Sequence, residues 1–465
     1  MTRAPGAGGR MVVVGGGLAG ITAALEAASL GAEVVLVERR ARLGGLTWSF
    51  ERNGRTFDNG QHVFMRCCHA YRAFLRRIGA ADQVHLQSRL DVPVLAPGGR
   101  QAHISRSTAP LPSPLHLAGS LLSYSHLGVK DRLRAGQVVA ALRRLRLDDP
   151  SLDAESFGSF LARHGQSAAA LERLWDLVIL PTVNVGAAEA SLALAAKVLR
   201  TGLLDQADGG DLGWSLVPLG VLHGENGRRA LERAGVEVLC STAVDAIAAG
   251  ARGAGGHGAD ASPVTVTAGS RRLRADAVVV AVAHDAARAL LPADAIGDLS
   301  GLGRSPIVNV HLVLDRKVTD LPFAAAVGSP VQFVFDRTDS SGTEAGTQCL
   351  VVSLSAATGE IGARPETLVT RYFEALGTLF PAARRASLVD AVVTREHAAT
   401  FRGVPGTAAL RLGPSTACHG VYVAGAWCAT GWPATMEGAV RAGNAAAAAA
   451  ITGCRIERPL EEVPA

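Results

Sequence analysis

Lysine is nearly absent from this chain of 465 residues, since only three of its 46 basic side chains are lysines. Charged residues make up only 19% of the sequence, and the net charge is +5. The basic residues form no stripe interleaved with aromatics, so we expect no nucleic-acid partner. Aromatic residues are also scarce at 5%, but hydrophobic residues reach 48%, which excludes a disordered chain.

Cysteines are few and irregularly spaced. The chain has seven, an odd number, and none forms a C-x-x-C pair. This excludes a disulfide framework and a zinc site of ordinary spacing, so we expect no metal and a reducing, cytoplasmic environment. The adjacent Cys67 and Cys68 could oxidise together, but two small, half-buried side chains are the simpler interpretation.

Long apolar runs are also missing. Residues 107–129 and 412–436 lack charged side chains, but prolines and glycines interrupt both stretches. We therefore expect no membrane-spanning helix. The first residues are polar and the next apolar run is broken by glycines, so no secretory signal is expected. The length predicts two or more domains.

The clearest local unit covers residues 11–38. The run MVVV predicts a strand, GGGLAG a glycine turn, ITAALEAASLG a helix and AEVVLVE a second strand. Together they predict a βαβ unit and a parallel sheet. Further patterns predict helices at 70–79, 130–147, 155–180 (interrupted by Pro181), 365–378 and Thr435–Ile451, strands within 235–285, 306–314, 331–335, 349–355 and GVYVAGA, and a loop insertion at 248–262.

The glycines of this unit have the spacing of a dinucleotide-binding turn. Gly15 permits the tight turn, Gly17 lets the backbone approach a pyrophosphate, and Gly20 lets helix and strand pack closely. The helix N-terminus offers free N–H groups to the phosphates. Glu38 ends the second strand, where it can accept hydrogen bonds from ribose hydroxyls, so the whole pattern predicts a dinucleotide.

Two further segments resemble those of FAD proteins. The sequence from Glu38 to Gly45 resembles the extended signature of the glutathione-reductase-type FAD proteins. Gly425 and the segment Gly431–Val440 resemble the part that closes the FAD site in the amine oxidase and carotenoid desaturase superfamily. The resemblance implies FAD, bound by Gly15, Gly16, Gly17, Leu18, Ala19, Gly20, Glu38, Arg39, Gly44, Gly45, Leu46, Gln61, Val244, Gly425, Trp432 and Met436.

A narrower resemblance rests on the polar turn Asp58–His62. This turn resembles a motif of the squalene-associated FAD-dependent desaturase family, the hydroxysqualene dehydroxylases. The segments Ser305–His311, Gln332–Arg337 and Trp432–Val440 support it, and the likeness runs from about residue 11 to residue 452. The chain departs from many members in two places, having Leu46 instead of arginine and Ala426 instead of aspartate.

The resemblance implies an α/β fold in which a glutathione-reductase-type FAD-binding Rossmann domain is joined to a substrate domain with a mixed sheet and a helical cap. We expect a discontinuous FAD-binding domain of residues 11–70, 220–290 and 415–455. Residues 71–219 and 291–414 are then expected to form the substrate domain.

The resemblance also implies a reaction, in which reduced FAD delivers a hydride to hydroxysqualene and the hydroxyl leaves to give squalene. Such a step needs a proton donor, and our candidate is His62, with Asp58 beside it. The alternative is that both residues only brace the turn against FAD. His311 is a weaker candidate. Trp432 and Met436 are expected near the flavin ring, with ordinary core packing as the alternative.

A C30 hydrocarbon resides in membranes, so we expect a peripheral enzyme at the inner face of the cell membrane. The uncharged segment 107–129 could be the docking surface, and a buried linker is the alternative reading. The electron donor is not identified by the sequence.

Other functions remain open at this point. A phytoene-type desaturase would share the FAD motifs. An amine or protoporphyrinogen oxidase is less favoured, because Lys197 and Lys317 fall outside any segment that we place near the flavin, where many amine oxidases use a lysine. A non-enzymatic flavin scaffold that passes isoprenoids between enzymes is a further possibility.

Overall fold

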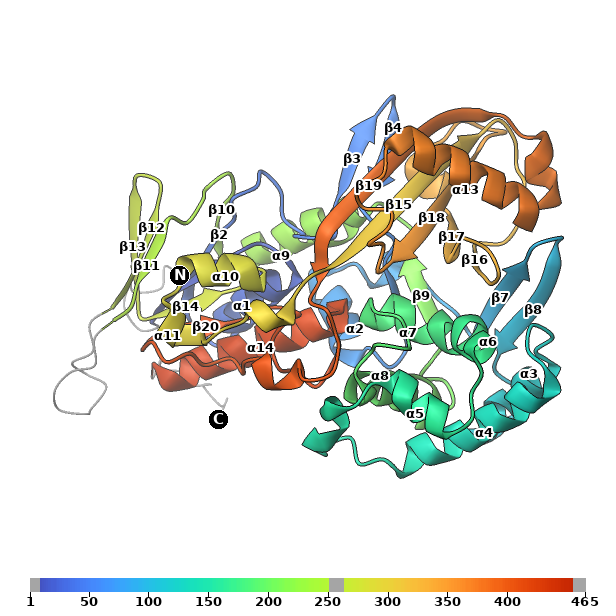
Figure 1. Cartoon of the computed structure of the whole chain (residues 1–465). Helices are drawn as coiled ribbons and strands as arrows, with labels where there is room; N and C mark the ends of the chain where they lie inside the picture. Colours follow the sequence, from blue (N-terminus) through green and yellow to red (C-terminus); the bar gives the residue numbers. More distant parts are fainter. Residues whose placement is uncertain (1–8, 251–262, 455–465) are drawn as a thin grey trace, which may run out of the picture.

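The structure, a computed structural model, describes residues 9–250 and 263–454, so most of the loop insertion expected at 248–262 lies outside the described residues. A five-stranded parallel sheet forms one half of the molecule (Figure 1). Its strands are almost wholly apolar because helices cover the sheet and bury it. In spatial order they are β10 (Glu237–Leu239), β2 (Glu33–Val37), β1 (Arg10–Val14), β14 (Ala277–Val280) and β20 (Val421–Val423).

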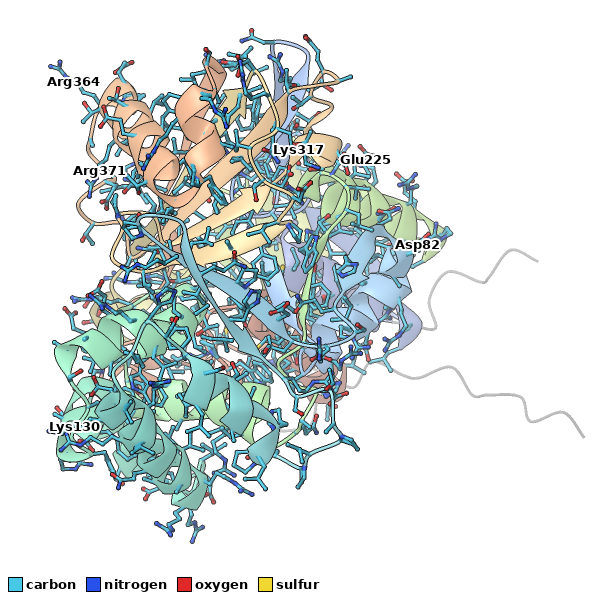
Figure 2. The ribbon with its side chains drawn as sticks, turned by 90° about the vertical axis from the view of Figure 1, so that its right-hand side faces the viewer. Asp82, Lys130, Glu225, Lys317, Arg364 and Arg371 are labelled. Carbon is cyan, nitrogen blue, oxygen red and sulfur yellow. The ribbon has the colours of Figure 1, made fainter. Side chains whose placement is uncertain are left out.

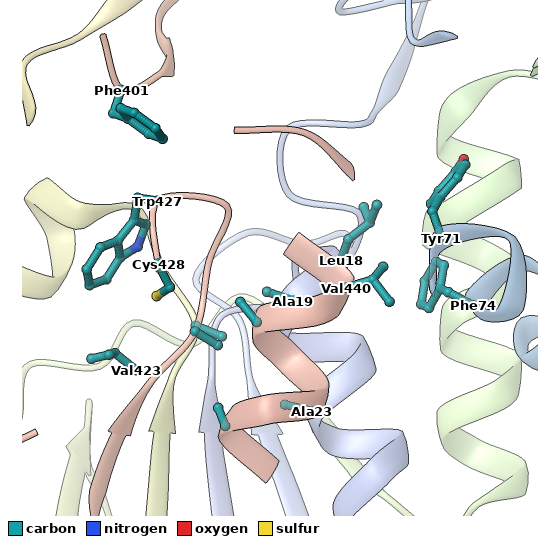
Figure 3. Packing of buried hydrophobic residues seen from close by; sticks show 14 of the residues in the cluster. Leu18, Ala19, Ala23, Tyr71, Phe74, Phe401, Val423, Trp427, Cys428 and Val440 are labelled. Atoms are coloured by element: carbon teal, nitrogen blue, oxygen red, sulfur yellow. The ribbon is translucent and has the colours of Figure 1, made fainter. Parts of the chain in front are cut away.

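Two helices from opposite ends of the chain pack together against this sheet. They are α1 (Leu18–Ser29) and α14 (Met436–Gly453), and Figure 3 shows Ala19 and Ala23 of α1 in the same packed cluster as Val440 of α14. A Cβ atom on Gly443 would lie 2.3 Å from the carbonyl oxygen of Ala19. Glycine at this position therefore permits the close approach of the two helices.

A seven-stranded mixed sheet forms the other half. One of its faces, including Val308, Val310 and Leu312, packs under α13 (Pro365–Leu379). Side chains alternate along a strand, so Asn309 and His311 point to the opposite face. The order is β19 (Leu388–Thr400), β15 (Ser305–Leu314), β18 (Gln348–Ser355), β17 (Phe333–Asp336), β16 (Phe323–Ala326), β7 (Asp91–Ala96) and β8 (Arg100–Ser105).

Three small sheets complete the β structure. A hairpin across Gly269 and Ser270 joins residues 264–268 to residues 271–275, and the chain changes sheet at Asp276, after which β14 joins the parallel sheet. The small sheets are β3 (Ser49–Arg52) with β4 (Arg55–Asp58), β5 (Val63–Met65) with β9 (Leu212–Ser215) and β6 (Val84–Leu86), and β11 (Ala246–Ala248) with β12 (Val264–Ala268) and β13 (Arg271–Ala275).

The expected helical cap is present as a separate group of helices (Figures 1 and 2). Our expectation that Pro181 interrupts its helix is wrong, since α7 continues to Val183. Pro181 removes only the hydrogen bond to the carbonyl four residues earlier, that of Leu177, and α7 ends soon after, at Asn184 in the left-handed conformation. The group contains α3 (Ala118–Ser123), α4 (Val129–Arg144), α5 (Phe157–Arg163), α6 (Ala168–Ala170), the π-helix η4 (Leu171–Trp175), α7 (Asp176–Val183), α8 (Leu192–Leu199) and the π-helix η5 (Arg200–Leu204).

The remaining helices lie against the two larger sheets or between strands. These helices are α2 (His69–Ile78), η6 (Gly220–Glu225), α9 (Asn226–Arg233), α10 (His284–Leu290), α11 (Ala293–Ile296) and α12 (Thr338–Ser341).

No helix within residues 9–250 and 263–454 is both long and apolar enough to cross a membrane.

Candidate active site

The carboxyl ends of three parallel strands meet at one edge of the sheet. Gly15 follows β1 with a φ of 105°, and a Cβ atom there would lie 2.5 Å from the carbonyl oxygen of Ala281, just beyond β14. Gly425 follows β20, and a Cβ atom there would lie 2.6 Å from Nε1 of Trp427, whose ring N–H donates to the carbonyl of Val282 at 2.9 Å. In doubly wound sheets this edge is where ligands bind.

Two glycine loops lie against each other at this edge. A Cβ atom on Gly20 would lie 1.8 Å from the carbonyl oxygen of Gly15, and one on Gly45 would lie 2.8 Å from Cα of Gly17. The N–H of Gly44 donates to the carbonyl of Gly16 at 2.8 Å. The backbone of the first loop is thus bare of side chains where the second approaches it.

The N-terminus of α1 fits a phosphate group. No side chain caps this helix, and its first turn contains no acidic residue. The N–H groups of the first turn, which include those of Leu18 and Ala19, have no partner within the helix and present the positive end of its dipole. The edge of the sheet, the glycine loops and this helix therefore fit the diphosphate of the expected dinucleotide.

Glu38 follows β2 at this edge, with a carboxylate that could accept hydrogen bonds from a ribose. Its carboxylate accepts the N–H of Gly16 at 2.6 Å and that of Arg40 at 2.8 Å, one on each oxygen. Each carboxylate oxygen keeps a second lone pair for a ribose hydroxyl. Val244 follows β10 and is half-buried, two residues after Thr242, whose N–H donates to the Glu38 carbonyl. Arg39 and Leu46 are exposed.

Arg42 is a candidate site residue that the sequence analysis missed. Its guanidinium lies 4.1 Å from the centre of the Trp48 ring and donates to the carbonyl of Gly45 at 3.2 Å. Burial and the neighbouring Arg40 lower the pKa of Arg42 to about 10, so it stays charged at neutral pH. A cation at the second glycine loop fits a diphosphate. Its position two residues before the glycine pair is the only signal in the sequence.

The polar turn Asp58–His62 connects the glycine loops to the mixed sheet. The Asn59 side chain donates to the Leu46 carbonyl at 2.7 Å. The Asn59 carbonyl in turn accepts Nδ2 of Asn309 at 3.1 Å and Oγ1 of Thr394 at 2.8 Å. The turn is therefore held from both sides, by the cofactor half and by the sheet face opposite α13.

The side chains of Asn309 and His62 both lie near Gly60 of this turn. A Cβ atom on Gly60 would be 3.5 Å from Nδ2 of Asn309 and 3.6 Å from Nε2 of His62. Asn309 is 1% exposed, and its Oδ1 has no hydrogen-bond partner among the described residues. Gln61 also has an unpartnered amide nitrogen in this region. Buried polar atoms without partners are costly, so they fit a site that a ligand completes.

His62 is neutral near pH 7 in this environment. Burial lowers the pKa of His62 to about 4, and the Leu46 carbonyl offsets this only in part. His311, the weaker candidate, is fully buried with its ring edge-on to Phe57, and burial lowers its pKa to about 3. His311 lies two residues along β15 from Asn309 and packs in the hydrophobic cluster beneath β3 and β4.

Asp58 forms a buried ion pair with Arg337. One carboxylate oxygen lies 3.0 Å from the guanidinium, and the other accepts Oγ of Ser49 at 2.6 Å and the N–H of Leu219 at 2.9 Å. Burial raises the pKa of the Asp58 carboxyl, while Arg337 opposes this shift. All of these contacts tie strands β4 and β17 to the segment before η6.

A narrow cavity adjoins the turn. Gln61 and His62 form part of its polar wall together with the ion pair just described. Its apolar wall consists of Val63, Trp214, Leu219, Pro322 and Phe335. Trp214 continues into an aromatic row, since its ring meets that of Phe323 at 5.4 Å between centres. Ser215 and Asp336 complete the polar wall, so the lining combines an apolar side with a polar and charged side.

The C-terminal segment is arranged around Trp432. Arg441 and Lys197 each lie 5.2 Å from the centre of its ring. Lys197 is thus beside the segment that we expect near the flavin, which corrects the expectation that it lies outside any such segment. Burial and Arg441 lower the pKa of Lys197. Met436 is half-buried at the start of α14.

Glu437 is fully buried and serves a different helix. Its carboxylate accepts the N–H of Tyr71 at 2.8 Å and that of Ala70 at 3.2 Å, and it pairs with Arg441 at 2.7 Å. Cys68 at the N-cap of α2 provides no cap of its own. Glu437 therefore caps α2 from α14.

Sequence comparisons agree along nearly the whole chain. The profile described as flavin containing amine oxidoreductase matches residues 18–451. The hydroxysqualene dehydroxylase of Rhodopseudomonas palustris is 27% identical over 94% of this chain and 96% of its own length, and that of Sinorhizobium fredii is 27% identical over 95% and 98%. The zeta-carotene desaturase of Solanum lycopersicum is 30% identical, but over only 36% of this chain and 30% of that protein.

Solved structures agree with the fold. Cyclohexylamine oxidase from Brevibacterium oxydans superposes with a TM-score of 0.67 over 96% of this chain and 99% of its own, at 20% identity. At that identity the likeness shows the fold alone. It confirms the expected architecture of a dinucleotide-binding half joined to a mixed-sheet half.

Proposed function

The chain belongs to the flavin-containing amine oxidoreductase family and is an FAD-dependent oxidoreductase, and we propose that it removes the hydroxyl group of hydroxysqualene to give squalene. The proposal proceeds from its similarity to the hydroxysqualene dehydroxylases. The observation that carries the proposal is the polar turn Asp58–His62, which donates from Asn59 to the Leu46 carbonyl beside the second glycine loop and lines, with His62, a cavity that has an apolar wall. Two relatives with this name that match over almost their whole length support it.

FAD, when bound and reduced, supplies the hydride. The substrate loses its C–O bond, the carbon gains the hydride, and the oxygen leaves as water after it receives one proton. His62 in its imidazolium form provides that proton and returns to the neutral ring, the form that its pKa of about 4 favours. The unpartnered Oδ1 of Asn309 accepts the hydrogen of the substrate hydroxyl and turns its oxygen toward His62.

The other site residues hold this arrangement. Asp58, through its ion pair with Arg337, fixes the start of the turn that carries His62, so we assign it a positioning role. The apolar wall with Trp214 and Phe335 excludes water from the bond that breaks. We also propose that the glycine loops, Glu38 and the C-terminal segment bind FAD. We propose further that the enzyme acts at a membrane surface. The electron donor stays outside the proposal.

Anaerobic single turnover tests the function. The purified protein is reduced, hydroxysqualene is added in detergent, and flavin absorbance and extracted lipid are followed together. Flavin reoxidation that matches squalene formation supports the proposal. If hydroxysqualene does not reoxidise the reduced flavin, and a carotenoid precursor reduces the oxidised flavin, the protein is a desaturase instead.

A His62→Gln variant separates the proton donor from a brace. Glutamine keeps a hydrogen-bond donor but cannot transfer a proton, so squalene formation falls by about 100-fold if His62 is the acid. The flavin spectrum and FAD affinity stay unchanged in that case. Loss of FAD binding with an unaltered rate in the fully loaded fraction would show that His62 only braces the turn.

A further inference from the structure

Exposed hydrophobic side chains are concentrated in one short part of the chain. Of the ten large hydrophobic side chains that are exposed within the described residues, six lie between residues 111 and 147. Val129, Leu133 and Leu122 are the most exposed, at 63%, 60% and 59%. Single exposed leucines are ordinary, whereas so many within one short segment point to a partner. The six are Leu111, Leu115, Leu122, Val129, Leu133 and Leu147.

Helix α4 has apolar residues on its outward side as well as its inward side. Ala135, Val138 and Leu142 are buried and face the protein. On the opposite side, Val129 and Leu133 are exposed and are followed at helical spacing by Gly136 and Ala140. A surface helix that faces water alone carries polar residues there. The outward side of α4 is therefore suited to an apolar environment.

Basic side chains flank this apolar strip. At 100° per residue, Lys130 and Arg144 fall on one side of it and Arg143 on the other, and all three are exposed. No carboxylate lies within 4 Å of their charged groups in the part of the chain that the structure describes. The single acid of the helix, Asp131, is turned inward and accepts the hydroxyl of Ser167 at 2.8 Å.

This part of the chain is positively charged. Residues 107–149 contain six basic and three acidic side chains, a net charge of +3, and Arg146 pairs with Asp148 at 3.1 Å. A localised positive region around an apolar strip complements an anionic lipid surface, with hydrocarbon below and phosphate groups above.

We propose that the six exposed hydrophobic side chains together with Lys130, Arg143 and Arg144, here called the docking face, bind the surface of an anionic lipid membrane. The leucines enter the boundary between headgroups and acyl chains, and the three basic side chains reach lipid phosphates. The face refines the expected segment 107–129, of which Leu115 and Leu122 are exposed but Leu127 is buried. It extends instead along α4.

The docking face is connected to the inner helices of the same group. Tyr124, which precedes α4, donates its hydroxyl to the carbonyl of Arg173 in η4 at 2.7 Å. η4 continues into α7, which lies against β18 of the mixed sheet. In Figure 2, Lys130 marks this group at the end of the molecule opposite Arg364 and Arg371. A membrane bound here would thus meet the helices that lead toward the sheet face carrying Asn309.

Vesicle sedimentation tests the proposal. The full-length, FAD-loaded protein is mixed with vesicles of phosphatidylcholine alone or of equal parts phosphatidylcholine and phosphatidylglycerol. We expect strong binding to the anionic vesicles only. Replacing Lys130, Arg143 and Arg144 by glutamine should weaken it on the order of 100-fold, since each basic group contributes about fivefold. The double variant Leu122→Ser, Leu133→Ser should weaken it by about tenfold or more.

Matched controls come from the same chain. Leu388 and Val389 are exposed apolar residues on β19, and Arg271 and Arg272 are an exposed basic pair on β13. Their Ser and Gln variants should bind vesicles like the unaltered protein. An unchanged flavin spectrum shows that each variant is folded. Binding is measured without substrate, so its failure leaves the proposed reaction standing, and failure of the reaction leaves this proposal standing.

Three outcomes would overturn the proposal. The protein could ignore anionic vesicles, or the docking-face variants could bind as well as the unaltered protein. In the third, sedimentation velocity without lipid shows an oligomer that Leu122→Ser, Leu133→Ser dissociates, while vesicles bind none of the proteins. The face would then be an interface between copies of this chain.

Discussion

The side-chain amide of Asn309 either only anchors the turn Asp58–His62 or also binds the substrate, and a substitution can separate these two roles. Two side chains donate to the same Asn59 carbonyl, Nδ2 of Asn309 and Oγ1 of Thr394. Only Asn309 also offers a buried acceptor without a partner. We predict that Asn309→Leu slows squalene formation in single turnover by about 10- to 100-fold, as loss of one buried hydrogen bond to substrate implies. Flavin absorbance serves as the rate probe.

Thr394→Val is the matched control for this change. It removes the other donor to the Asn59 carbonyl but no group that faces the ligand. If Asn309 only anchors the turn, both variants lose rate equally. If it binds the hydroxyl, Thr394→Val retains nearly the full rate, and equal losses would contradict the assignment.

The sequence could not single out Asn309 or Arg42. Asn309 sits within the strand pattern PIVNVHLVL, where a lone amide resembles any polar interruption of a strand. Which side of the sheet it faces depends on pairing with β18 and β19, partners that are about 40 and 85 residues away. The glycines and Glu38 were predictable because a turn between a strand and a helix is a local structure with strict steric demands.

At the scale of elements, the contact between the two glycine loops controls cofactor binding. Gly45 and Gly54 both have positive φ, 60° and 72°, so alanine strains each by a similar amount. Only at Gly45 would the added Cβ meet backbone, 2.8 Å from Cα of Gly17, whereas at Gly54 nothing lies within 4 Å. We predict at least a tenfold rise in the FAD dissociation constant for Gly45→Ala, measured by fluorescence titration of the apoprotein.

Gly54→Ala provides the comparison. Each substitution costs about 1 kcal/mol of stability through its positive φ, so any effect of strain alone appears in both variants. Unchanged FAD affinity in Gly54→Ala combined with a loss in Gly45→Ala assigns the effect to the loop contact. Similar affinities in both would argue against it.

The cap that α14 provides to α2 is a second relation between elements. Glu437→Gln keeps the shape of the side chain but removes the charge that faces two N–H groups and Arg441. We predict a loss of about 1–3 kcal/mol in the free energy of unfolding, the range for a buried charged hydrogen-bond acceptor. Urea unfolding followed by circular dichroism measures it.

Glu26→Gln is the control for that prediction. Glu26 pairs with Arg77 at 2.6 Å, but both side chains are about one-third exposed. Such a pair contributes about 0–1 kcal/mol. A loss in Glu437→Gln no greater than that in Glu26→Gln would show that the buried carboxylate is dispensable for α2.

Element boundaries followed the sequence only where pairing is local. The βαβ unit, the hairpin across Gly269 and the helix α13 were predictable from periodicity and turn residues. Strand β19 was not predictable because its polar and apolar residues do not alternate regularly. It is an edge strand of the mixed sheet and pairs only with β15. The division at Asp276 was not predictable because two short strand-forming runs, Arg271–Ala275 and Ala277–Val280, follow each other directly, while they pair with strands in different sheets.

At the scale of the whole molecule, joining two halves buries several histidines in neutral form. His223 accepts or donates a 2.7 Å hydrogen bond with the hydroxyl of Tyr71, and burial lowers the pKa of His223 to about 3. His311 in the mixed sheet and His62 in the turn are lowered to about 3 and about 4. None of these positions was predictable as a titration site, because burial arises only once the two halves meet.

These histidines make stability depend on pH. Their pKa is about 6.5 in the unfolded chain, so below that value the unfolded state binds protons that the folded state excludes. The stabilisation is complete above pH 6.5 and is lost as pH falls toward the folded values. Between pH 6.5 and 5, each histidine contributes a slope of up to about 1.4 kcal/mol per pH unit to the free energy of unfolding. We predict that urea unfolding at pH 7, 6 and 5 gives a slope of several such contributions and that His311→Gln reduces it by one. The slope, unlike the absolute stability, is insensitive to lost packing, so an unaltered slope in His311→Gln would contradict a neutral buried His311.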